Sequence, residues 1–444
     1  MINQFRWVRG FNDYDNWQQS SWSGEVASTF YNTEEPKNCQ GCHMEETSSE
    51  NPVERKRGFV HDHRFLGSNT VLPLLKGDLA QFRRVEQFLT DPEDPKVTVD
   101  IFAGGLEQRF DETGSGHGEI MVAPLDKGGF SIVPGERLIL DVVVKNRAVG
   151  HNFPAGTTDL WSVWLELLIT DGSQRVLSHS GRLLDVPEGE VDPQAHFFRV
   201  FPLDELGQWI DKGNRWDART NLYDTTIPSG TADVVHYRFR VPEKVVGPLT
   251  IEAKLNYRKY LNYFANWVFG GRPVPGKDEL MTITSDGREW ILEEKPIPAM
   301  PIITMARDSV VIPIRENQKN RGVLASFQED FLRFNDYGIG LLRQENLEGA
   351  RRAFEEVVRL KPDYPDGHIN LARVLIREGK FNEALASLDE ADNQRPEYAK
   401  TAYFRGVVEK MKGNFREAEA LFERVKLTYP RDRKLLKTLG QTYY

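Results

Sequence analysis

The sequence predicts a multidomain α+β protein with three parts: a region of loops and short helices, a central antiparallel β-sandwich and a C-terminal α-solenoid. Two periodicities favour this fold class. A 34-residue repeat runs through the last quarter of the chain, and strand-like apolar alternation dominates its middle. With 444 residues, 39% of them hydrophobic, the chain is long enough for several separate cores. We place the regions at 1–115, 116–295, 296–330 and 331–444.

The first region, 1–115, combines loops and short helical stretches with many aromatic residues near its start. Eight of the first 31 residues are aromatic: Phe5, Trp7, Phe11, Tyr14, Trp17, Trp22, Phe30 and Tyr31. Few aliphatic residues accompany them. Such a cluster suits packing against a large flat ligand or another chain, or a small aromatic core.

Only two cysteines are present, Cys39 and Cys42, and His43 follows them directly. This C-x-x-C-H sequence is typical of covalent haem attachment, because two thiols on one tight turn reach two vinyl groups of a porphyrin. A zinc site needs about four ligands, and no second pair follows. Polar flanks argue against a thioredoxin-like redox pair, and a disulfide here would restrain the chain only slightly. The sequence therefore predicts one covalent haem c, with His43 as the proximal iron ligand.

Residues 116–295 are predicted to form the β-sandwich. Apolar runs that suit strands recur at 137–144, 161–169, 234–241 and 249–255. No helical pattern separates them, so we expect antiparallel pairing in an immunoglobulin-like arrangement. The stretch 296–330 begins with several prolines and then becomes highly charged, which is typical of a linker.

The last region, 331–444, repeats every 34 residues. Prolines recur at Pro362, Pro396 and Pro430, and small residues recur at Gly338, Ala372, Gly406 and Gly440. Small residues let paired helices approach closely, and proline ends a helix because it lacks an N–H. The pattern resembles the tetratricopeptide repeat, and three repeats with a final helix suffice for a stable stack. Such repeats usually bind peptides or proteins, so we expect the concave face to dock a partner protein.

Three further motifs resemble modules of periplasmic multihaem c-type cytochromes. They are Tyr14-x-x-Trp17-x-x-Ser20, His61-Asp62-His63-Arg64-Phe65-Leu66-Gly67 and Gly150-His151-Asn152-Phe153-Pro154-Ala155-Gly156. The resemblance implies electron transfer and a periplasmic or extracellular location, where haem attachment takes place. The chain departs from the family pattern at Trp22, where relatives commonly have a haem-ligating histidine, and it lacks a second C-x-x-C-H.

We therefore expect a reduced member of that family with one haem, or one polypeptide of a larger haem assembly. The first seven residues contain no apolar signal-peptide core. A processed or truncated chain, or a misassigned start, is the expected reason.

A six-coordinate iron needs a second axial ligand opposite His43. The favoured candidate is His63, on which the resemblance centres. The second choice is His151, in a loop stiffened by glycine and proline, which faces this haem or one on a neighbouring chain, and His61 is an alternative. Arg64 is a candidate partner for a haem propionate, because a guanidinium fork matches a carboxylate. Each could instead be an ordinary loop residue.

These features predict an electron-transfer cytochrome rather than an enzyme, docked through its repeats to a redox partner, to other cytochrome subunits or to copies of itself. Two alternatives stay open: an extracytoplasmic scaffold with a structural haem, and a haem-based reductase subunit. The net charge of −9 argues against nucleic-acid binding, which depends on a surplus of Lys and Arg. No apolar run approaches the roughly 18 residues that a membrane span needs.

Overall fold

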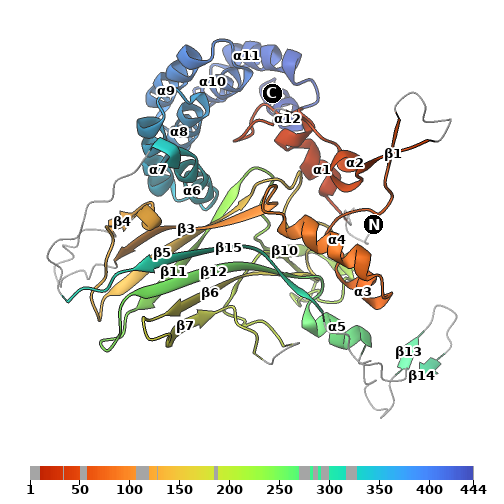
Figure 1. Ribbon diagram of the computed structural model, residues 1–444. Helices are drawn as coiled ribbons and strands as arrows, with labels where there is room; N and C mark the ends of the chain where they lie inside the picture. The colour runs from red at the N-terminus through yellow and green to blue at the C-terminus, as the bar shows by residue number, and fades with distance from the viewer. Residues whose placement is uncertain are drawn as a thin grey trace.

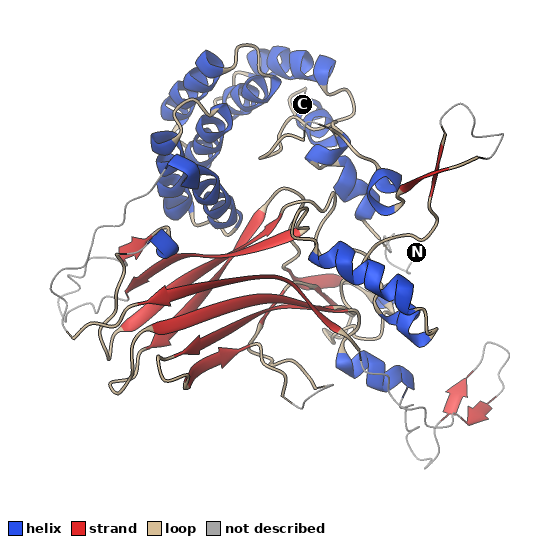
Figure 2. Ribbon diagram, viewed as in Figure 1, coloured by secondary structure: helices blue, strands red, loops and turns tan. Residues whose placement is uncertain are grey.

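The computed structural model describes residues 11–33, 35–50, 58–106, 120–127, 129–184, 189–269, 281–283, 289–291, 300–316 and 328–443. A β-sandwich lies at the centre, an arc of helices stands on one side of it, and a region of short helices lies beside both (Figure 1). Figure 2 shows that most strands lie in the sandwich and most helices in the other two parts, with a short pair of strands in the N-terminal region. The predicted α+β fold class is confirmed. Phe5 and Trp7 of the aromatic cluster lie outside the described residues.

Two antiparallel sheets form the sandwich. The first has the order β11–β5–β3–β4, with bounds Ala232–Arg240, Arg137–Asn146, Val97–Leu106 and Ile120–Val122. The second has the order β15–β12–β6–β7, with bounds Ile302–Ile312, Leu249–Arg258, Ser162–Thr170 and Val176–Ser180, and β8 (His196–Phe197) also pairs with β6. Short two-stranded pairs are β1 (Glu46–Ser48) with β2 (Phe59–His61), β9 (Val200–Leu203) with β10 (Thr220–Asp224), and β13 (Met281–Ile283) with β14 (Glu289–Ile291).

Side-chain alternation determines which face of each strand is buried. Along β12, Leu249, Ile251, Ala253 and Leu255 are fully buried between the sheets, while the residues between them are only partly covered. Each aliphatic side chain removed from water in this way contributes about 1.5–3 kcal/mol. All four apolar runs proposed from the sequence form strands of the sandwich, β5, β6, β11 and β12.

Two predicted boundaries are wrong. The stretch 296–330 was expected to be a linker, but it contains β15, which pairs with β12 along its whole length. Prolines precede β15 and hide its alternation of buried and exposed residues. The sandwich also begins earlier than residue 116, because β3 pairs with β5.

Short helices occupy the N-terminal region, and α-helices in antiparallel pairs form the arc. The short ones are α1 (Asp13–Gln18), α2 (Cys39–His43), α3 (Val71–Leu75), α4 (Leu79–Thr90) and, after β12, α5 (Asn262–Phe269). The arc consists of α6 (Phe331–Arg343), α7 (Leu347–Leu360), α8 (Pro365–Arg377), α9 (Phe381–Gln394), α10 (Ala399–Met411), α11 (Phe415–Thr428) and α12 (Arg433–Gly440).

Glycine allows the close approach within these pairs. A Cβ built on Gly406 would lie 2.7 Å from Cε1 of Phe422, and one on Gly338 would lie 2.8 Å from Cε1 of Phe354. Both phenylalanines are fully buried, so their rings have little room to move. The small residues Gly338 and Gly406 are therefore packing requirements, as their spacing predicted, whereas a Cβ on Gly440 would meet open space.

The arc and the sandwich share one apolar core. Phe102, Val143 and Val234 on the outer face of the first sheet belong to the same buried cluster as Phe334 and Ile339 of α6. Ion pairs border it, among them Arg333 Nε to Asp100 Oδ2 at 2.8 Å. Because a shared core resists relative motion, the solenoid is fixed on the sandwich rather than tethered to it.

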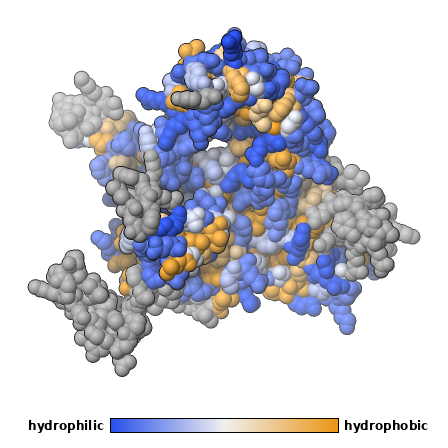
Figure 3. All heavy atoms as spheres, turned by 180° about the vertical axis from the view of Figure 1, so that it is seen from behind, coloured by the Kyte–Doolittle hydropathy of each residue, from blue (hydrophilic) through white to orange (hydrophobic). Residues whose placement is uncertain are grey.

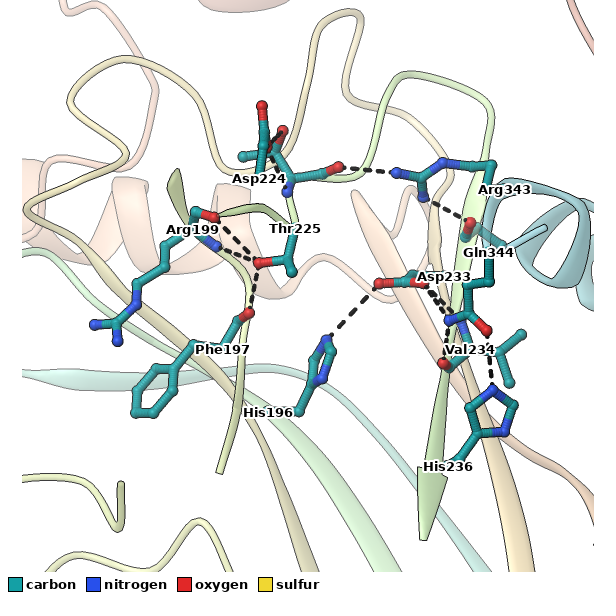
Figure 4. A network of polar contacts seen from close by, with 12 residues as sticks. His196, Phe197, Arg199, Asp224, Thr225, Asp233, Val234, His236, Arg343 and Gln344 are labelled. Atoms are coloured by element: carbon teal, nitrogen blue, oxygen red, sulfur yellow. Dashed lines mark hydrogen bonds and ion pairs between the residues drawn. The ribbon is translucent and has the colours of Figure 1, made fainter. Parts of the chain in front are cut away.

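A polar network continues this interface (Figure 4). Gln344, which follows α6, donates from Nε2 to Asp233 Oδ1 at 2.9 Å and to the Val234 carbonyl at 2.6 Å. Its Oε1 lies 2.9 Å from His236 Nε2, while Arg343 donates to backbone carbonyls of the sandwich. One glutamine thus joins the solenoid to both the backbone and the charged side chains of β11.

His236 should make folding stability depend on pH. The Nδ1 atom of His236 lies 2.6 Å from Asp141 Oδ1, and this hydrogen bond raises the pKa of His236 above 6.5. Partial burial of the ring lowers the pKa, but the negative charge of Asp141 and the hydrogen bond to Gln344 raise it further. Because the folded-state pKa is the higher one, the stabilisation is complete below pH 6.5 and is lost as the pH rises through that pKa. Urea unfolding at a series of pH values should show the loss in the natural protein and a flatter profile in His236→Asn. If stability changed with pH in the same way in both proteins, His236 would not be the group responsible.

The outer surface is mainly hydrophilic on the face seen in Figure 3, with apolar residues in scattered patches. Among the described residues, no helix combines the length and apolar character that crossing a bilayer requires.

Candidate functional site

The two cysteines lie on α2, a single turn of helix. Asn38 caps this turn, because its Oδ1 accepts the Gly41 N–H at 2.9 Å. Cys39 is exposed and Cys42 is partly buried, and both thiols are free rather than joined in a disulfide. Burial raises the pKa of Cys42. The turn therefore presents two available thiols and ends on His43.

The orientation of His43 is fixed by the backbone of a neighbouring loop. Its Nδ1 lies 2.5 Å from the Leu66 carbonyl, and the Leu66 N–H donates to the His43 carbonyl at 2.9 Å. Since a carbonyl only accepts, Nδ1 carries the proton and Nε2 keeps a lone pair for a metal. Burial lowers the pKa of His43, which also favours the neutral form that binds metals.

His151 faces His43 in a matching arrangement. The two ring centroids are 6.2 Å apart, and the ring planes differ by only 9°. The Nδ1 of His151 lies 2.9 Å from the Asn152 carbonyl, which again leaves Nε2 without a proton. Two imidazoles on opposite sides of one metal ion, each bonded at about 2 Å, have centroids roughly 6 Å apart. The separation of the two rings therefore matches that of two histidine ligands of one haem iron, while the rings themselves are arranged as a parallel stack.

Aromatic rings surround this histidine pair. Phe65 stacks on His43 with centroids 4.5 Å apart, and Phe88 of α4 lies 6.2 Å from it. Large apolar side chains of the N-terminal region are also exposed: Phe11, Tyr14, Phe59, Phe65, Leu72, Leu75 and Leu79.

The other predicted site residues lie apart from this pair. His61 ends β2, where its Nδ1 lies 2.9 Å from the Met44 carbonyl. His63 and Arg64 are exposed in the following turn. In the described part of the chain, the rings that lie against His43 are Phe65, Phe88 and His151, not His63. The sequence ranked His151 second because nothing in its spacing from His43 shows that the two loops meet.

The region around α1, which carries the Tyr14-x-x-Trp17-x-x-Ser20 motif, connects the loop of the cysteine turn with the loop that carries His151. Trp17 donates from Nε1 to the Lys37 carbonyl at 2.8 Å, just before the cysteine turn. On the other side of α1, Asp13 Oδ1 accepts the Gly156 N–H at 3.2 Å. The motifs that resembled multihaem cytochromes therefore converge on the two histidines.

Among the described side chains, no group of three or more His, Cys, Asp or Glu residues is arranged to hold a metal ion. Two histidines that face each other and two thiols on the turn before His43 are donor types that suit an iron porphyrin.

A second feature of the N-terminal region is the path of residues 26–32, which we call the groove segment. It lies along the inner side of the helical arc, as Figure 1 shows for the chain that precedes α2. The Ala27 N–H donates to Asp432 Oδ2 at 2.9 Å, at the start of α12. At the other end Tyr31 donates to Asp336 Oδ1 of α6 at 2.5 Å and accepts from Asn335 at 2.7 Å.

Arg373 of α8 holds the middle of the groove segment. It donates from Nη2 to the Thr29 carbonyl at 2.6 Å. Its guanidinium carbon lies 4.0 Å from the centre of the Phe30 ring and 4.5 Å from that of Phe404. Part of the concave face that we expected to dock a partner is therefore filled by the chain's own residues.

Comparisons with known proteins identify the helical arc. The tetratricopeptide repeat model matches residues 341–405 and again 375–442. The C-terminal part of the chain therefore consists of tetratricopeptide repeats, as the 34-residue period predicted. No curated protein matches the chain.

Solved structures similar to this chain include tetratricopeptide repeat domains of other proteins. One is the second such domain of human RPAP3 in complex with an HSP70 peptide: 21% identical, covering 26% of this chain and 97% of that chain, with a TM-score of 0.25. The Arabidopsis OM64 domain is 16% identical; the match covers 26% of this chain and 96% of that chain, with a TM-score of 0.25. The N-terminal domain of STI-1 from C. elegans is 20% identical; the match covers 27% of this chain and 99% of that chain, with a TM-score of 0.23.

Proposed function

We propose that this protein is an electron-transfer c-type cytochrome whose single haem is attached through Cys39 and Cys42 and bound axially by His43 and His151. The observation that supports it most strongly is the imidazole pair, near-parallel and 6.2 Å apart, with both Nδ1 atoms engaged by backbone carbonyls. In this proposal His151, rather than His63, is the distal ligand. A location outside the cytoplasm, periplasmic or extracellular, belongs to this proposal.

When bound, the haem would supply one-electron redox chemistry. The residues of the chain would hold it in a fixed environment. His43 and His151 supply neutral nitrogen ligands whose orientation is set by the main chain, so neither ring has to turn when the charge on the iron changes. His43 and His151 would both hold the haem, which would leave no coordination site for a substrate and favours a carrier over a reductase subunit. Arg64, which is exposed, remains the proposed partner of a propionate.

The tetratricopeptide repeats indicate that the protein interacts with other proteins. We propose that this partner is a redox protein, another cytochrome subunit or a further copy of the chain. A second candidate function is an extracytoplasmic scaffold with a structural haem. The shared core of solenoid and sandwich favours it, because that core makes the repeats a rigid part of the molecule.

The proposal predicts covalent haem and reversible redox chemistry. The full chain, produced in a host equipped for cytochrome c maturation, should exceed the mass of its sequence by that of one haem. It should also titrate reversibly with one electron. Cys39→Ala/Cys42→Ala is the matched control, which should carry no covalent haem. A colourless product with both thiols free to alkylate would overturn the assignment, and covalent haem that cannot be reduced and reoxidised would favour the scaffold.

A further inference from the structure

A cleft of about 1190 Å³ lies on the outer face of the β15–β12–β6–β7 sheet. Its floor is formed by outward side chains of β6, β12 and β15. One wall is the segment 90–99, which leads from α4 into β3, and the other is formed by residues 181–183 after β7. These residues take no part in the histidine pair described above. Clefts of this size can hold a small organic molecule.

The floor of the cleft carries a continuous chain of hydrogen bonds across four strands. Thr304 Oγ1 donates to Asn256 Oδ1 at 2.8 Å, and Asn256 Nδ2 donates to Glu166 Oε2 at 2.7 Å. The other carboxylate oxygen, Glu166 Oε1, lies 2.8 Å from His179 Nε2. Because a carboxylate only accepts, Nε2 carries the proton.

This chain of bonds ends in a free acceptor. With its proton on Nε2, His179 keeps a lone pair on Nδ1, and within the described residues that atom has no hydrogen-bond partner. The side chain is 28% exposed and lines the cleft. A histidine oriented by a carboxylate in this manner is suited to accept a hydrogen bond from a hydroxyl group.

Positive charge lies beside this acceptor. Lys254 stands directly opposite Glu166 on one side and directly opposite Arg307 on the other, so two cations face each other across β12 and β15. Like charges in such a pair repel unless an anion lies between them. Lys254 has an ion pair with Glu252 at 2.9 Å, but Arg307 has none among the described residues.

A second cation of the lining resembles Arg307 in this respect. Arg182 lines the wall of the cleft and forms no ion pair within the described part of the chain. The acidic residues of the lining are Asp91 and Glu166, and Glu252 adds a third carboxylate through its ion pair with Lys254. The charges around the cleft therefore balance, and Arg182 and Arg307 are the cations whose guanidinium groups are available to bind an anion.

We propose that this cleft binds a hydroxylated organic anion, such as a sugar acid or a sugar phosphate. Its carboxylate or phosphate would lie among Arg307, Lys254 and Arg182, which share the ability to bind either oxyanion. A neighbouring hydroxyl would donate to Nδ1 of His179. The site is independent of the haem.

Isothermal titration calorimetry on the full, haem-loaded chain tests this proposal with four probes: D-glucuronate, D-glucose 6-phosphate, D-glucose and acetate. At least one of the two anionic sugars should bind ten-fold or more tightly than glucose and than acetate. Preference for glucuronate would identify a carboxylate ligand, and preference for glucose 6-phosphate a phosphate ligand. Equal affinities for all four probes, or no binding of any, would overturn the proposal.

Variants then assign the binding to the cleft. Arg307→Gln should weaken binding of the preferred anion at least ten-fold. Arg240→Gln removes an exposed arginine on β11 of the other sheet and should leave binding unchanged. His179→Ala should reduce the preference for the hydroxylated anion over acetate. Equal losses in Arg307→Gln and Arg240→Gln would place the binding elsewhere and overturn the assignment.

Discussion

Replacing His151 with Ala is expected to convert a six-coordinate, low-spin haem into a five-coordinate, high-spin one. The ring of His151 lies 6.2 Å from that of His43 and nearly parallel to it, and no other histidine ring lies against His43 in the described structure. Loss of the ring would open one axial position, because alanine has no donor atom. Ferrous His151→Ala should bind carbon monoxide rapidly and stoichiometrically, whereas the natural protein should not.

Two further variants make the test specific. His63→Ala removes the exposed histidine that the sequence favoured, and its spectrum and carbon monoxide binding should match those of the natural protein. His151→Met should stay low-spin but show a higher reduction potential, because a thioether ligand raises the potential relative to imidazole. If the haem stayed low-spin in His151→Ala and became high-spin in His63→Ala, His63 rather than His151 would be the distal ligand.

Arg373→Ala should lower the free energy of unfolding by about 2–4 kcal/mol. The buried guanidinium lies between the Phe30 and Phe404 rings and donates to the Thr29 carbonyl at 2.6 Å. Truncation would leave a cavity between the two rings and a carbonyl without its donor. The free energy of unfolding can be measured with urea, and proteolysis should cut the groove segment faster in the variant.

Arg377→Ala is the matched control, one turn further along α8. Its side chain is 51% exposed and pairs with Glu345 at the surface, so its loss should change stability by less than about 0.5 kcal/mol. Equal stability of the two variants would show that the groove segment contributes little to holding the solenoid.

The features that the sequence predicted well are those that repeat along the chain. The 34-residue period placed Gly338 and Gly406 where helices touch, and period-two alternation identified four strands of the sandwich. Alternation failed at β15 because prolines before Ile302 are typical of a linker. Local patterns thus predict elements well wherever turn-forming residues do not mask them.

Contacts between distant loops could not be predicted in this way. His43 and His151 belong to separate loops, and no repeating pattern in the sequence indicates that these loops lie side by side. Phe30 and Tyr31 were expected to pack against a flat ligand, another chain or a local aromatic core, but they pack on the solenoid of their own chain. Such contacts depend on the assembled fold, which a single sequence does not display.

The hydrogen bond from Ala27 to Asp432 joins positions 405 residues apart. During synthesis this contact cannot form until residue 432 has emerged, because its acceptor is the residue that caps α12. The cysteine turn, only a few residues beyond the groove segment, therefore stays untethered on that side until translation has passed Asp432. An enzyme that attaches haem during this interval would meet an accessible peptide, and closure of the arc would follow as a late step.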